Sequence, residues 1–329
     1  MTYRDNRIDS MKGFLIILVV LGHVIGVAGS GVLNDRLWKL IFLFHMPMFV
    51  MLSGYLTQRK GDIKVFWNKQ KSLLLPFLVF QVMSLLIVSG IFKECLTPIS
   101  FIIPYWSLWY LISLLFWRIF IEYTPSVIIN KPFIFLLIAI LMALFSGLLH
   151  YGRVLSIQRT LNFFPFFLFG YYMGSGLIKK QLWPKALSFT VVLFSIIWLI
   201  DILPPPVSNV IQYDGDIKLL LRGADHYSFL DIPMKVILIS CAFVLSMSLF
   251  NIIPEVKFLS IIGRDSLFYY LWHAPIVKFI LPLLCTKLHL PKSFIWMIVY
   301  TLVVILLLWV MSHSKLFRWF VLPIKNNKK

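Results

Sequence analysis

Long runs of hydrophobic residues, separated by short polar segments, repeat along the whole chain. A bilayer has a hydrocarbon core about 30 Å thick, which a helix of about 20 mainly apolar residues can cross. Windows of that length predict ten membrane-spanning helices. They are expected near residues 11–30, 37–56, 73–92, 105–121, 133–150, 161–178, 186–203, 232–250, 265–284 and 294–313. The pattern therefore predicts an all-α fold, a polytopic transmembrane helix bundle of about ten spans.

Composition supports the same class of protein. The chain is 60% hydrophobic and only 13% charged, with a mean hydropathy of +0.89, and no soluble domain tolerates such a surface. The longest polar segment, 204–230, opens with three prolines and is expected to be a loop. Spans and short connections use nearly all of the 329 residues. We therefore expect one integral-membrane domain, 1–329, with no separate soluble domain.

The distribution of basic residues predicts the orientation. With the N-terminus inside, the connections on the inner side hold 20 of the 31 lysines and arginines, and such an excess marks the cytoplasmic side. Both termini are then cytoplasmic, and the multi-pass protein is expected in the cytoplasmic (inner) membrane. The net charge of +18 is explained by this asymmetry and by contact with anionic lipids. Nucleic acid is not expected as a partner.

Three histidines lie inside predicted spans, at His23, His45 and His273. Ionisable side chains within a membrane are rare and usually functional. By helix rise, His23 lies about 16 Å above Lys12, and the other two lie about 12 Å from their entry faces. Pro47 and Pro275, each two residues after a histidine, are expected to break the backbone there. We therefore expect the three imidazoles to share one site near mid-membrane. The alternative for each is a structural hydrogen bond between helices.

Six segments spread over the chain resemble, in order, the acyltransferase-3 family of membrane O-acyltransferases, and most closely its fucose 4-O-acetylase-like branch. They are Arg7–Gly13 with His23, Phe44–Phe49, Ser53–Tyr55, Trp106–Leu111, Phe163–Phe167 with Gly170, and Gly263–Leu267 with Tyr270 and His273. Members of this family usually move an acetyl group from cytoplasmic acetyl-CoA to a hydroxyl group of a surface polysaccharide or lipid-linked glycan. The resemblance implies an O-acetyltransferase with acetyl-CoA as donor substrate, no permanently bound cofactor and no metal.

The resemblance also implies roles for particular residues. The family's basic residue, followed by ten positions and a catalytic histidine, corresponds to Lys12 and His23. A neutral imidazole can take the proton of an acceptor hydroxyl, or His23 can first be acylated itself; both routes stay open. His45 and His273 complete the predicted catalytic set by orienting the base, holding the acceptor or polarising the thioester. Many members have arginine where this chain has Lys12, and the family's pair of arginines before the third span is replaced by Lys69-Gln-Lys71.

Candidate binding residues lie on both sides of the predicted membrane. The inner loop and the start of the third span carry a basic cluster that suits a phosphate-bearing donor, and the same charges also serve as a topology signal and contact lipid headgroups. The expected donor-binding residues are Lys12, Arg59, Lys60, Lys69 and Lys71. The acceptor or supporting residues are expected to be Ser53, Tyr55, Trp106, Trp109, Arg159 and Tyr270. Their aromatic members also suit an interfacial belt.

Two other classes of function remain as alternatives. A transporter or flippase for a lipid-linked saccharide also needs polar groups at mid-depth, although such proteins usually contain structural repeats, and none is visible here. A catalytically inactive scaffold of the same fold is the other alternative, and the retained histidines argue against it. Cys95, Cys241 and Cys285 have no metal-binding spacing.

Overall fold

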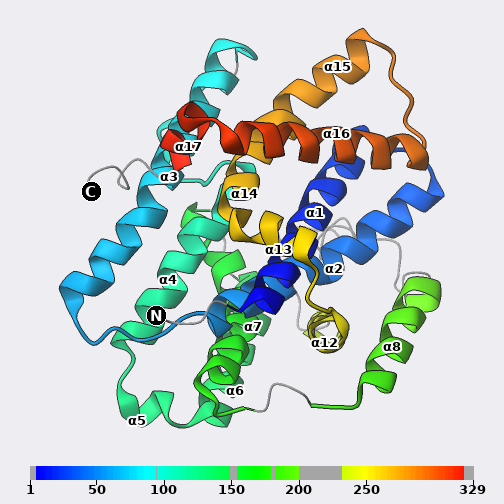
Figure 1. Ribbon diagram of the computed structural model, residues 1–329. Coiled ribbons are helices and arrows are strands. Elements are labelled where there is room, and N and C mark those ends of the chain that lie inside the picture. Colours follow the sequence, from blue (N-terminus) through cyan, green and yellow to red (C-terminus); the bar gives the residue numbers. More distant parts are fainter. Residues whose placement is uncertain (1–4, 94, 149–153, 179–181, 200–231, 322–329) are drawn as a thin grey trace. The chain divides into compact units, whose positions relative to one another are not determined.

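A computed structural model describes residues 5–93, 95–148, 154–178, 182–199 and 232–321 (Figure 1). Every regular element in these ranges is helical, so the all-α prediction is confirmed for the described part of the chain. The chain divides into two compact units, which are described separately. Unit 1 holds the described residues of 5–49, 182–199 and 241–321, and unit 2 holds those of 50–178 and 232–240.

Unit 1 is built from the two ends of the chain. Its helices are α1 (Asn6–Ala28), the first part of α2 (Val32–Tyr55), α8 (Lys185–Phe194) with a π-helical turn (Ser195–Leu199), the last part of α12 (Ile232–Ile252), α13 (Lys257–Arg264), α14 (Ser266–Pro275), a second π-helical turn (Ile276–Ile280), α15 (Leu281–Lys287), α16 (Phe294–His313) and α17 (Lys315–Val321). Helix α1 packs against α13, α14 and α16, which places it at the centre of this unit.

Unit 2 is built from the middle of the chain. It contains the end of α2, α3 (Ile63–Gly90), α4 (Trp109–Tyr123), α5 (Ser126–Ile129), α6 (Pro132–Phe145), α7 (Ile157–Ser175) and the start of α12. Short 3₁₀ turns occur at Pro98–Phe101, Trp106–Leu108, Ser146–Leu148 and Val154–Ser156. Helix α7 packs against α4 and α6, and α4 packs against α3.

Six helices in the described ranges are long and apolar enough to cross a membrane: α1, α2, α3, α12, the segment Ser266–Lys287 and α16. The other four predicted spans coincide with α4, α6, α7 and α8, which are shorter or more polar. Ten crossings therefore remain a prediction. The predicted loop at 204–230 lies outside the described residues.

The start of α1 is fixed by polar contacts to the chain around residue 250. Arg7 donates hydrogen bonds to the carbonyls of Phe250, Asn251 and Ile253, where α12 ends and its last carbonyls lack partners within the helix. The Ser10 hydroxyl donates to the carbonyl of Val256 and accepts from its backbone N–H, at 3.0 and 2.9 Å. These bonds hold α1 against the entrance to α13.

Glycines let α1 and α13 approach closely. A Cβ on Gly13 would collide with the carbonyl oxygen of Leu259, and a Cβ on Gly263 would collide with that of Asp9. Such backbone contacts between helices require small residues. The same device joins α2 to α7 within unit 2, where Gly54, Gly170 and Gly174 each touch backbone of the facing helix. Helix register in both units is therefore set by direct contacts between backbones.

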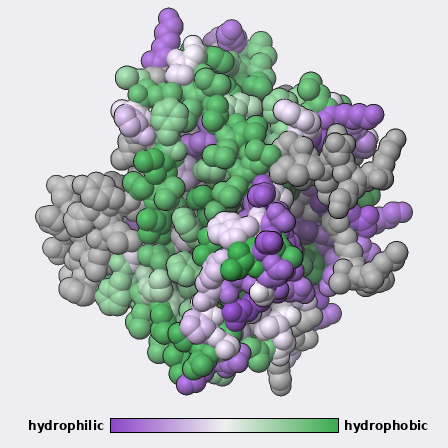
Figure 2. Space-filling model, turned by 90° about the vertical axis from the view of Figure 1, so that its left-hand side faces the viewer, coloured by the Kyte–Doolittle hydropathy of each residue, from purple (hydrophilic) through white to green (hydrophobic). Residues whose placement is uncertain are grey.

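Large apolar side chains cover much of the molecular face shown in Figure 2. On α16 the exposed residues recur along one side, and they include Ile295, Leu302, Leu306 and Val310. The opposite side of the helix, with Met297, Val304 and Leu308, is buried. An apolar surface of this kind suits contact with lipid chains rather than water.

Replacing Gly263 with alanine tests the backbone contact. The added Cβ must displace the Asp9 carbonyl, so Gly263→Ala should destabilise the protein by about 1–3 kcal/mol, as overpacking does. Gly90→Ala is the matched control because a Cβ there meets nothing within 4 Å. Thermal unfolding in detergent should show a lower midpoint for Gly263→Ala alone. Equal midpoints for the two variants would contradict the assigned contact.

Candidate active site

The three predicted histidines all belong to unit 1, and the structure brings them together. The rings of His23 on α1 and His273 on α14 stack with centroids 5.4 Å apart and an interplanar angle of 25°. Phe42 lies edge-on to both His23 and His45, at 5.5 and 4.8 Å. Thus side chains from α1, α2 and α14 form one cluster.

Backbone carbonyls fix the orientation of the two most buried imidazoles. His45 Nδ1 lies 2.7 Å from the carbonyl oxygen of Ile41, and His273 Nδ1 lies 3.2 Å from that of Tyr269. A carbonyl can only accept, so Nδ1 must carry the proton in each ring. The neutral imidazole then presents Nε2 with a lone pair. The two rings are buried, with exposed fractions of 1% for His45 and 0% for His273. Each ring therefore has, inside the protein, the tautomer that a proton acceptor needs.

The glycine contact between α1 and α13 explains why His23 meets His273. Each histidine lies ten residues beyond one of the two glycines in that contact, Gly13 and Gly263. The chain leaves α13 at Asp265 and continues directly into α14, which also packs against α1. Because the rise per residue is similar along α1 and along α13 and α14, the two imidazoles lie at similar distances from the glycine contact.

The two prolines after the histidines behave differently from each other. Pro275 is followed by the π-helical turn Ile276–Ile280, and such turns occur often at functional sites. The expectation that Pro47 breaks the backbone was wrong, because α2 runs through it from Val32 to Tyr55. A proline removes one helix hydrogen bond, and packing by neighbouring helices can keep such a helix continuous.

Lys12, the predicted partner of His23, is held by an acid. Its ammonium lies 2.6 Å from the carboxylate of Asp9, which is buried. Arg264 approaches the same carboxylate at 3.9 Å and donates to the side chain of Asn6 at 3.0 Å. One buried carboxylate thus faces two cations. The i, i+3 spacing of Asp9 and Lys12 on a helix is a sequence signal for such a pair.

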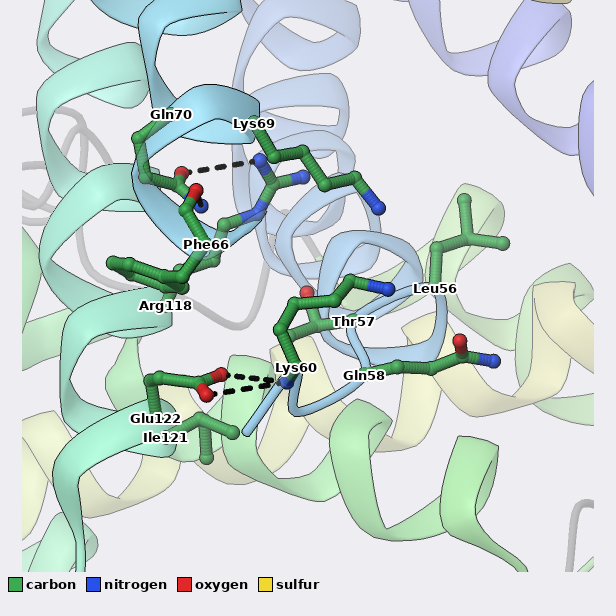
Figure 3. A pocket seen from close by; sticks show the side chains of 10 residues that line it. All are labelled: Leu56, Thr57, Gln58, Lys60, Phe66, Lys69, Gln70, Arg118, Ile121 and Glu122. Atoms are coloured by element: carbon green, nitrogen blue, oxygen red, sulfur yellow. Dashed lines mark hydrogen bonds between the residues drawn. The ribbon is translucent and has the colours of Figure 1, made fainter. Parts of the chain in front are cut away.

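A pocket in unit 2 gathers part of the predicted donor site (Figure 3). The empty space at this pocket, counted together with space open to solvent, is about 320 Å³. Its cationic side chains are Lys60, Lys69 and Arg118, and Lys69 is near enough to the other two for their charges to repel. The complete lining consists of Leu56, Thr57, Gln58, Lys60, Phe66, Lys69, Gln70, Arg118, Ile121 and Glu122.

Glu122 shapes this pocket through the backbone. Its carboxylate accepts hydrogen bonds from the N–H groups of Lys60 and Gly61 at 2.7–3.2 Å. Arg59 donates to the Glu122 carbonyl at 2.9 Å. Among the residues that the structure describes, no carboxylate forms an ion pair with Lys60, Lys69 or Arg118. Glu122 therefore fixes the loop while the three cations keep their charge for an anion.

The pocket separates the predicted basic residues into two groups. Lys60 and Lys69 line it, whereas Arg59 and Lys71 do not. Arg118, which was not among the expected donor-binding residues, lines the pocket and donates to Gln70 at 3.5 Å. Its position at the end of a predicted span, opposite the basic loop, was the available clue.

The predicted acceptor residues are distributed over both units. In unit 1, Tyr270 is buried with its ring 5.7 Å from that of His273. In unit 2, the Ser53 hydroxyl lies 2.5 Å from the hydroxyl of Tyr110, and Tyr55 lies half-buried at the end of α2. Tyr110 belongs to the same aromatic motif as Trp106 and Trp109.

The indole of Trp109 is already in contact with other side chains in unit 2. It stacks on Phe163 with centroids 5.0 Å apart, and the Arg159 guanidinium lies 5.2 Å from its ring. Trp106 is half-buried, with a positive φ of 47°. Trp109 therefore places Arg159 in a fixed cation–π contact.

No group of three metal-ligating side chains occurs within the described ranges.

Comparison with known proteins places this architecture in a family. The family model Acyl_transf_3, described as an acyltransferase domain, matches residues 5–313. Two nodulation proteins named NolL are 38% identical over short segments: 84 residues for the protein of Sinorhizobium fredii (strain NBRC 101917 / NGR234) and 85 for that of Mesorhizobium japonicum (strain LMG 29417 / CECT 9101 / MAFF 303099).

Each match covers 23% of this chain and 23% or 22% of the relative, so the matched part spans less than a quarter of the length of these curated relatives. No solved structure matches the chain. The family model covers both the histidine cluster and the basic pocket, and the chain therefore belongs to the acyltransferase-3 family of membrane acyltransferases.

Proposed function

We propose that this protein is an O-acetyltransferase that moves an acetyl group from cytoplasmic acetyl-CoA to a hydroxyl group of a surface polysaccharide or a lipid-linked glycan. The activity is that of the fucose 4-O-acetylase-like branch of the family. The observation that carries the proposal is the cluster of His23, His45 and His273, in which two rings have Nδ1 fixed on a carbonyl. In those two rings, His45 and His273, Nε2 is in the form that accepts a proton or a hydrogen bond, so both can support His23, the proposed base.

The proposed chemistry begins at the acceptor hydroxyl. An imidazole Nε2 takes its proton while the oxygen attacks the carbonyl carbon of the thioester. The carbon–sulfur bond then breaks, the ester forms, and the CoA thiolate receives a proton. His23 is the candidate base because it is only half-buried and stacks on His273. The alternative route, in which His23 is acylated first and deacylated by the hydroxyl, uses the same residues.

Lys60 and Lys69 are proposed to hold the phosphates of the donor, together with Arg118. Three cations around one pocket suit a ligand that carries several phosphates. Lys12 is proposed to act near His23, with its charge balanced by Asp9. The enzyme needs no permanently bound cofactor on this account. Its partners are acetyl-CoA, the glycan acceptor and membrane lipids.

The membrane arrangement is also part of the proposal. Ten crossings, with both termini in the cytoplasm, place the basic loop at 57–62 on the side that contains acetyl-CoA. The excess of positive charge on the inner connections supports this orientation. The protein is accordingly proposed to reside in the cytoplasmic (inner) membrane.

His23→Ala tests the catalytic assignment. The variant should insert normally and bind CoA as the wild type does, but acyl transfer should fall by about 10²- to 10⁴-fold, the usual contribution of a general base. The measurement is radiolabelled acetate transferred to surface glycan, at matched protein levels. Near-normal transfer by His23→Ala would remove this residue from the mechanism.

A pair of double variants tests the donor pocket. Lys60→Gln/Lys69→Gln removes two charges that line the pocket, whereas Lys64→Gln/Lys71→Gln removes two charges of the same region that do not line it. The first should raise the KM for acetyl-CoA at least tenfold with a smaller change in kcat, and the second should not. Added salt should reproduce part of the first effect. If both double variants change the KM for acetyl-CoA equally, the basic cluster serves only as a topology signal.

A further inference from the structure

A lysine is buried in unit 2 at the start of α12. Lys235 is only 4% exposed. Its ammonium donates a hydrogen bond to the hydroxyl of Ser146, with 2.8 Å between Nζ and Oγ. Ser146 directly follows α6, and its hydroxyl also lies 2.8 Å from the side-chain oxygen of Asn162 on α7. Helices α7 and α12 and the 3₁₀ turn after α6 thus contribute one polar residue each to a buried network.

The network leaves the ammonium incompletely satisfied. A lysine ammonium has three donors, and Ser146 Oγ is its one hydrogen-bond acceptor among the residues that the structure describes. No carboxylate of those residues forms an ion pair with it. A buried charge without a counter-charge is strongly unfavourable. A bound anion would supply the missing counter-charge.

Two ordinary structural roles of a lysine in a membrane helix do not supply the missing counter-charge. Lysines near the ends of membrane helices commonly extend to water, but Lys235 does not reach the surface. A cation is also favoured beside a helix C-terminus, and α6 ends next to Ser146. That dipole effect is several times weaker than the penalty for burying the charge.

We propose that Lys235, Ser146 and Asn162 form a phosphate-binding subsite for a phosphate group carried by a lipid. This inference rests on the proposed transfer to a lipid-linked glycan, because it assigns the acceptor a phosphate linkage. The ammonium supplies the charge and the side-chain N–H groups of Asn162 supply neutral hydrogen bonds, while Ser146, which accepts from Lys235 and donates to the Asn162 side-chain oxygen, positions both. Asn162 lies three residues after Arg159 on α7, so the subsite is one helical turn from the cation–π pair of Trp109 and Arg159.

Binding to the purified, full-length protein in detergent tests the subsite without any acyl transfer. Wild type, Lys235→Met and Lys278→Met are each titrated with a polyisoprenyl phosphate and with the corresponding polyisoprenol, and complexes are counted by native mass spectrometry. Lys278 is the matched control because it also lies within an apolar segment, Ser266–Lys287, yet is exposed. Wild type and Lys278→Met should prefer the phosphate at least tenfold, and Lys235→Met should lose this preference.

The outcomes separate the possible occupants and the underlying function. Displacement by phosphatidylglycerol as readily as by polyisoprenyl phosphate would identify a phospholipid headgroup as the phosphate source. A phosphate preference that survives intact in Lys235→Met would overturn the subsite. The binding assay contains no CoA and does not depend on acyl transfer. A protein that keeps the phosphate preference but transfers no acyl group would therefore count against the proposed function and not against the subsite.

A measurement on the wild-type protein covers the case in which Lys235→Met does not fold. Reductive methylation with isotopic formaldehyde reports the accessibility of each lysine amine. Polyisoprenyl phosphate should slow labelling of Lys235 at least fivefold, polyisoprenol should not, and Lys278 should label equally in both. A labelling rate of Lys235 that polyisoprenyl phosphate leaves unchanged would contradict the proposal.

Discussion

Polar groups buried among apolar helices must find hydrogen-bond partners inside the protein, since a lipid bilayer supplies none. This constraint organises the structure around the histidine cluster. His45 and His273 each place Nδ1 on a carbonyl of the preceding helical turn. The bond satisfies the N–H and at the same time fixes the tautomer, so the requirement for a buried partner also prepares Nε2 for proton transfer.

The same constraint explains how the helices are held in register. Arg7 and Ser10 satisfy backbone groups where α12 ends and α13 begins. Gly13 and Gly263 then allow the two helix backbones to touch. These contacts determine which residues of α1 and α14 meet further along, and His23 meets His273. The catalytic proposal therefore depends on small and polar residues that lie far from the imidazoles.

The sequence could predict the helices and the chemical types of the site residues, but it could not predict their contacts. Hydrophobic runs locate α1, α3 and α16 because span length is a local property. The stacking of His23 on His273 depends on residues 250 positions apart, which no local pattern encodes. Arg118 and Lys235 were not singled out from the sequence, because a basic residue near the end of a span resembles a topology signal. Their burial and partners become visible only after folding.

The stacked histidines are proposed to act as one catalytic unit, and a double-mutant cycle on His23 and His273 tests this cooperation. Acetyl transfer is measured for the two single alanine variants and for the double variant, in reconstituted membranes at equal protein content. Residues that act as a unit are strongly non-additive. The account predicts that the double variant is about as slow as the slower single variant. Effects that simply add, or a His273→Ala variant with wild-type activity, would contradict it.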